Sequence, residues 1–151
     1  ALLRNSIQLT TYTNKHFGYE VRIPKAWTTR STADDESEVI ISGGGEFFEV
    51  VVVPNPQHLS AQEWYSKQVP GVTAAEVPTE VWGGGTWAVA INGLARYLAT
   101  DNYIYTVSYN IGTNTEASLY NLYRVFWQSF TLSQAVTPPP ATTPEPGIPK
   151  S

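Results

Sequence analysis

The chain has 151 residues, a length that fits one domain of moderate size. Its formal net charge is −4 and its nine basic residues are scattered singly, a pattern that argues against a nucleic-acid-binding protein. It contains no cysteine, which excludes thiol nucleophiles, disulfides and thiolate metal sites, and no apolar run approaches the roughly 18 residues of a membrane span.

The composition favours an exported protein. The sequence has no methionine, so Ala1 is not a translation start, and we expect a leader to have been removed; trimming of the chain is the alternative. Tyrosine, threonine, asparagine and glycine dominate the polar positions, a mix suited to a β-rich surface outside the cell. The predicted location is extracellular or at the cell surface.

The first third of the chain predicts an apolar arm followed by strands. Residues 1–7 form the arm, with Leu2, Leu3 and Ile7 able to pack on their own domain or in a neighbour's groove, and residues 8–133 form the globular domain. Residues 19–23 alternate apolar and charged side chains, which predicts a half-buried strand ending at Pro24. The polar stretch 28–37 predicts a loop.

The middle of the chain predicts two strands and a helix. Residues 39–41 form a short strand, and the β-branched run 47–53 is typical of a central strand covered on both faces. Ser60 and Glu63 have the spacing of a capping box, which predicts a helix over 61–68 with Trp64 pointing inward.

The second half predicts a meander and a closing helix. Strands are expected over 77–82, 86–91, 94–100 and 103–111, with a type I′ turn at Asn92-Gly93. An amphipathic helix is expected over 115–130, because apolar residues recur there at helical spacing: Leu119, Leu122, Tyr123, Phe126 and Trp127. The predicted class is α+β, with an antiparallel sheet and two helices packed against it.

Two segments resemble a known family. YTNKHFGYEVRIPKAW (12–27) is similar to the opening of PsbP-like proteins, and YNLYRVFWQSFTL (120–132) is similar to their closing segment, with the Ser129-Phe130 pair in place. The resemblance implies an α/β/α sandwich in a bacterial exported member of a family of binding or assembly modules. It implies no catalytic residue and no cofactor. The metal-site motif of the plant photosystem subunit has no match here, so a photosystem role is not implied.

The polar residues suggest no catalytic or metal site. His16 and His58 are the only histidines and both fall in predicted loops, where an exposed histidine is the simplest interpretation. The acidic run Asp34, Asp35, Glu36 and Glu38 predicts a solvated loop rather than a Ca²⁺ site. Glu46 and Glu49 are three residues apart and should lie on opposite faces of a strand, which argues against a paired-carboxylate enzyme.

Trp82 and Trp87 flank the run Gly83-Gly84-Gly85, and the sequence leaves three roles open for them. They could be core tryptophans of a hairpin, anchors of a protein interface, or platforms for a sugar.

Residues 134–151 form a Pro-rich segment that predicts an extended tail of polyproline II character. Its interface candidates are Pro138, Pro139, Pro140, Pro144, Pro146 and Ile148. Thr137, Thr142 and Thr143 beside prolines suggest O-glycosylation, with an unmodified linker as the alternative.

These features lead to two hypotheses for the function. The first is a non-enzymatic structural subunit of an extracellular filament or surface assembly, joined head to tail with copies of itself through the terminal extensions. The second is a monomeric secreted or envelope-tethered binding module with a Pro-rich linker. Both predict no cofactor, no metal, no nucleic acid and no membrane span.

Overall fold

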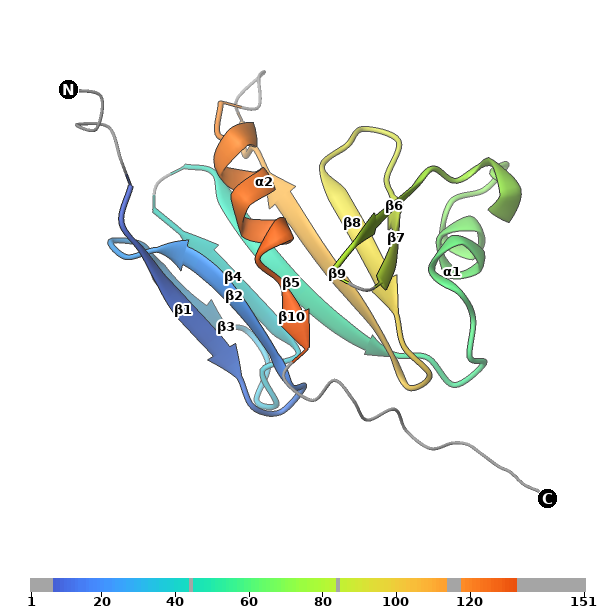
Figure 1. The fold of residues 1–151 in the computed structure, drawn as a ribbon, viewed down its shortest axis with the longest axis horizontal. Helices are drawn as coiled ribbons and strands as arrows, with labels where there is room; N and C mark the ends of the chain where they lie inside the picture. Colours follow the sequence, from blue (N-terminus) through green and yellow to red (C-terminus); the bar gives the residue numbers. More distant parts are fainter. Residues whose placement is uncertain (1–6, 44, 84, 114–117, 133–151) are drawn as a thin grey trace.

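A computed structural model of the chain describes residues 7–43, 45–83, 85–113 and 118–132 (Figure 1). The predictions for Leu2, Leu3 and the Pro-rich segment lie outside these residues.

The large sheet is antiparallel, and its seven strands run in the order β3-β4-β5-β9-β8-β7-β6. Their bounds are β3 Thr28–Ser31, β4 Glu38–Ser42, β5 Phe47–Pro54, β6 Thr79–Trp82, β7 Gly85–Val89, β8 Ala95–Ala99 and β9 Tyr103–Asn110. A second sheet has β2 (Tyr19–Pro24) in its centre, flanked by β1 (Leu9–Asn14) and β10 (Thr131–Leu132).

The two helices cover opposite faces of the large sheet, since side chains alternate along β7 and β8. Trp87 and Leu98 join the core cluster of α2 (Tyr120–Gln128), whereas Ala88 and Tyr97 join the cluster of α1 (Ala61–Gln68). Figure 1 shows α2 crossing in front of β5 and β9 beside the small sheet, with α1 at the β7–β8 end. The predicted α/β/α arrangement of an antiparallel sheet and two helices is confirmed.

Aromatic rings fill the core between the large sheet, the small sheet and α2. Phe48 stacks on Phe126 with ring centroids 4.8 Å apart, and Tyr19 stacks on Phe130 at 5.3 Å. Tyr123 is fully buried, and its hydroxyl donates a hydrogen bond of 2.8 Å to the carbonyl of Val107 in β9. These contacts join α2 and the small sheet to the large sheet.

The capping box at the start of α1 is confirmed. The Glu63 amide donates to the Ser60 hydroxyl, and the Ser60 amide donates to the Glu63 carboxylate. The inward ring of this helix is Tyr65, however, which is only 6% exposed. Trp64 is half-buried and packs beside Tyr97 at the margin of the helix.

Several predicted boundaries were wrong. The stretch 28–37 contains the edge strand β3, whose four residues are all exposed and therefore show no alternation of polarity. The strands predicted over 77–82, 86–91, 94–100 and 103–111 are each shorter, and the closing helix is described from Tyr120 to Gln128. β1 was not predicted, because its six residues LTTYTN have little apolar alternation.

The turn at Asn92-Gly93 is not of type I′, which needs a positive φ at both central residues. The Gly93 amide donates to the Ala90 carbonyl, so Ile91 and Asn92 are the central residues, and Gly93 follows them with a φ of +76°. In the other glycine-containing turn, Trp82 and Gly85 are paired across β6 and β7, and Gly83 has a φ of +61°.

β5 is central in the sheet but is covered on one face only, contrary to the prediction. Phe48, Val50 and Val52 are buried under α2 and the small sheet, whereas Phe47, Glu49 and Val51 on the other face are half-exposed. α1 is too short to cover both ends of the sheet, so no helix of the described residues covers this part of the second face.

We therefore expect adjacent phenylalanines of β5 to differ sharply in their contribution to stability. Phe48→Ala should lower the free energy of unfolding by about 3–5 kcal/mol, because it leaves a cavity in the aromatic core. Phe47→Ala, the matched control, should cost about 1 kcal/mol or less. Urea denaturation measures both, and equal losses would contradict the one-sided burial of the strand.

Candidate functional site

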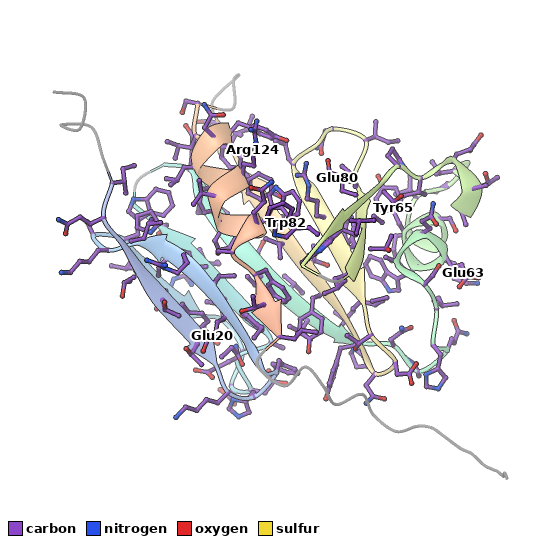
Figure 2. The ribbon with its side chains drawn as sticks, viewed as in Figure 1. Glu20, Glu63, Tyr65, Glu80, Trp82 and Arg124 are labelled. Atoms are coloured by element: carbon purple, nitrogen blue, oxygen red, sulfur yellow. The ribbon has the colours of Figure 1, made fainter. Side chains whose placement is uncertain are left out.

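A groove lies between α2 and the edge strand β6, with a volume of about 510 Å³. We call it the Trp82 groove, and its principal lining residues are Glu80, Trp82, Arg96, Tyr120, Arg124 and Trp127. Figure 2 shows Glu80 and Trp82 of β6 on one side and Arg124 of α2 on the other.

Arg96 forms the floor of the groove and is only 4% exposed. Its Nε–H donates to Oε1 of Glu80 at 3.0 Å, its Nη1 donates to the Gly93 carbonyl, and its guanidinium lies 4.5 Å from the centre of the Trp127 ring. Burial lowers the pKa of Arg96, but hydrogen bonds to Glu80 and Tyr120 outweigh burial and raise it. The floor therefore carries a permanent positive charge, compensated by one carboxylate.

The two tryptophans of the β6–β7 hairpin have different environments, because Trp82 lies in an edge strand and Trp87 next to the core. Trp87 is 2% exposed, as the core interpretation predicted, and contacts Trp127 and Phe130 edge-on. Trp82 is 41% exposed, and its Nε1–H donates to the carbonyl of Gln128 at 2.6 Å. Trp82 is thus held in place while its ring faces solvent.

The indole of Trp127 has a buried donor without a partner. The residue is only 3% exposed, yet its Nε1–H makes no hydrogen bond to any residue that the structure describes. Such a group costs roughly 1–3 kcal/mol of desolvation free energy. Trp127 lines the groove, but its Nε1 atom is itself enclosed, so this donor is not a contact point for a molecule in the groove.

A second hollow, of about 580 Å³, lies on the uncovered face of the large sheet beside α1. Glu49 lines it and is hydrogen-bonded to Glu38 of the neighbouring strand β4. Burial, together with this hydrogen bond and the charge of Glu38, raises the pKa of Glu49 to about 7. The same hydrogen bond lowers the pKa of Glu38. The two carboxyl groups therefore share a proton below neutral pH.

Of the other polar candidates, the structure brings His16 and Glu36 together in one exposed pair. His16 lies 3.1 Å from Glu36, and His58 lies 2.8 Å from the Asp101 carbonyl; both histidines are exposed. Asp34 and Asp35 are exposed, and among the described residues no group of three or more acidic or histidine side chains is placed to hold a metal ion.

Glu46 and Glu49 lie on opposite faces of the sheet, as the sequence predicted. Glu46 is buried and accepts hydrogen bonds from Tyr109 and Ser118. Its carboxylate therefore joins β9 to the start of the segment that leads into α2.

Ile7 is the one residue of the predicted N-terminal arm that the structure describes. It is 53% exposed and borders a shallow apolar hollow with Pro24 and Trp27. No helix in the described part of the chain is both long and apolar enough to cross a membrane.

Arg96, the central residue of the groove, was not predicted from the sequence. A signal was available: in the predicted strand 94–100, Arg96 shares a face with Leu98, so the strand alternation places a charge toward the core. A buried arginine requires partners for its charge. These partners lie in β6 and α2, which are distant from Arg96 in the sequence, so no local pattern predicts that they meet it.

Comparison with known proteins identifies the fold. No protein-family model matches the sequence, and no curated protein sequence matches it. Among solved structures, the chain resembles cyanobacterial PsbP (CyanoP) from Synechocystis sp. PCC 6803, with a TM-score of 0.57 and 14% sequence identity. The match covers 85% of this chain and 94% of that chain. The chain therefore has a PsbP-like fold, as the two sequence segments predicted.

The Glu38–Glu49 pair predicts an unusual pH dependence of stability. The folded chain keeps the Glu49 proton up to about pH 7, whereas the unfolded chain releases it near its usual pKa, which is lower. This contribution to stability is therefore complete below the unfolded-state pKa and is lost as the pH rises toward 7. Glu38, with a lowered pKa, titrates below this window.

Urea denaturation between pH 5 and pH 8 tests this prediction. The free energy of unfolding of the native chain should fall more steeply with pH than that of Glu49→Gln. Glu20→Gln, which changes a half-exposed carboxylate of β2, should keep the native slope. Parallel curves for the native chain and Glu49→Gln would contradict the shared proton.

Proposed function

We propose that the chain is a non-enzymatic binding module that acts outside the cytoplasm after export, and that the Trp82 groove is its recognition surface. The observation that carries the proposal is the exposed ring of Trp82, fixed by its hydrogen bond to the Gln128 carbonyl, in a groove that the exposed Arg124 also lines. A ring for stacking and a charged donor in the same groove are the elements of a recognition site.

The polar groups of the groove support binding rather than chemistry. Arg96 and Glu80 are engaged with each other, and Arg96 also holds Tyr120 with a hydrogen bond of 3.3 Å. These contacts fix the shape of the groove and leave Arg124, exposed above the Tyr120 ring, as the charge at its rim.

A second candidate is the structural subunit of an extracellular filament or surface assembly, with copies joined through their terminal extensions. The observation that favours it is that the large sheet ends in the strands β3 and β6, whose residues are all exposed. Open edges of this kind are templates for pairing with another chain. Regular fibres of native material in electron microscopy would support this candidate.

The binding proposal predicts that Trp82 controls ligand affinity. The purified chain is tested against an array of oligosaccharides and proline-rich peptides, with Trp82→Ala and the matched control Trp64→Ala, which removes a tryptophan packed beside Tyr97 on the opposite face of the sheet. Trp82→Ala should weaken a ligand at least about 10-fold, as for a central aromatic anchor, and Trp64→Ala should leave its affinity unchanged.

Two results would contradict the proposal. One is a ligand that binds Trp82→Ala as tightly as the native chain. The other is the absence of any binding to the array at millimolar concentrations.

A further inference from the structure

We propose that the occupant of the Trp82 groove is the Pro-rich segment of a second copy of this chain. This inference rests on the binding function proposed above and names its partner. The segment contributes the polyproline II ligand, and the groove contributes the aromatic rings and the guanidinium donor that such a ligand requires.

The chemistry of the groove matches a polyproline II helix. Such a helix has no internal hydrogen bonds, so its carbonyl groups are exposed acceptors, and its proline rings pack into grooves lined by aromatic side chains. The Trp82 groove offers the exposed ring of Trp82, the ring of Tyr120 and the exposed guanidinium of Arg124. A carbonyl of the ligand would accept from that guanidinium.

Charge supports the same ligand. The groove has two guanidinium groups, Arg96 and Arg124, and one carboxylate, Glu80, which is bound to Arg96. The Pro-rich segment carries Glu145 between Pro144 and Pro146. A glutamate held on a stiff polyproline II helix is a partner for the exposed guanidinium of Arg124.

The position at which the described chain ends favours binding of the Pro-rich segment to the groove of a second copy rather than to the groove of its own chain. Leu132 lines a separate hollow on the other side of Trp82, and the two hollows share only Trp82. Five residues, 133–137, separate Leu132 from Pro138. The segment would have to reverse over the Trp82 hairpin within those five residues before its stiff proline run begins.

The Pro-rich segment is long enough to reach a neighbouring copy. A polyproline II segment of 15 residues spans roughly 45 Å, more than the width of one small domain. Each copy has one groove and one Pro-rich segment, so the contact is heterologous and propagates head to tail.

Sedimentation velocity of the full-length chain over a range of concentrations tests the inference. The native chain should self-associate. The groove variant Trp82→Ala and a segment variant with serine at Pro138, Pro139 and Pro140 should each associate at least about 10-fold more weakly, whereas Trp64→Ala should behave as the native chain. Mixed together, the two defective variants should form a complex of one copy of each, because one keeps its segment and the other keeps its groove.

Arg124→Gln separates recognition from folding. It removes the guanidinium, and because Arg124 is exposed, the urea midpoint should change little. Self-association should weaken about five-fold, the worth of one hydrogen bond. In NMR spectra, a synthetic peptide of residues 137–151 should shift the Trp82 indole signal of the native chain.

Three results would overturn the inference. Peptide binding by a chain that stays monomeric would place the segment in its own groove. Self-association that Trp82→Ala leaves intact would place the contact elsewhere. Failure of the peptide to bind, while an oligosaccharide binds in a Trp82-dependent manner, would remove the Pro-rich segment as the occupant and leave the proposed binding function standing.

Discussion

Arg96 brings a full positive charge into the space between β8 and α2, where only 4% of the residue is exposed. An uncompensated buried charge is very costly, so its neighbours must supply a carboxylate, a carbonyl and aromatic faces. Glu80 of β6, the Gly93 carbonyl and the ring of Trp127 do so, and they come from an edge strand, a turn and a helix. The shape of the Trp82 groove follows from this one requirement, because two of these partners, Glu80 and Trp127, also line it.

The sequence predicted the elements whose signal is local. The capping box of α1, the alternation in β2 and the helical spacing of α2 each depend on residues close together in the chain, and each is confirmed. β1 and β3 were missed, because strands at the margin of a sheet have exposed side chains and acquire their structure only from a neighbour. Whether the second face of β5 is buried depends on how far α1 extends over the sheet. The residues of β5 carry no information about the length of α1.

The candidate site was predicted only in part. The sequence pointed to Trp82 and Trp87 but left their roles open, and burial separates them: Trp87 belongs to the core and Trp82 to the surface. The remaining residues of the groove come from β8 and α2, and their meeting is a property of the tertiary fold. A donor without a partner, such as that of Trp127, is a feature of three-dimensional packing and has no sequence pattern.

The small sheet has a mechanical consequence. β1 and β10 both run antiparallel to β2, so they are parallel to each other; Leu9 lies opposite Pro24, and Leu132 lies opposite Tyr19 at the other end of β2. Tension applied between the two termini would pull β1 and β10 in opposite directions along the strand axis. The interstrand hydrogen bonds, which are perpendicular to that axis, would be loaded in shear and would have to break together rather than one after another. Domains linked end to end would resist extension through this sheet.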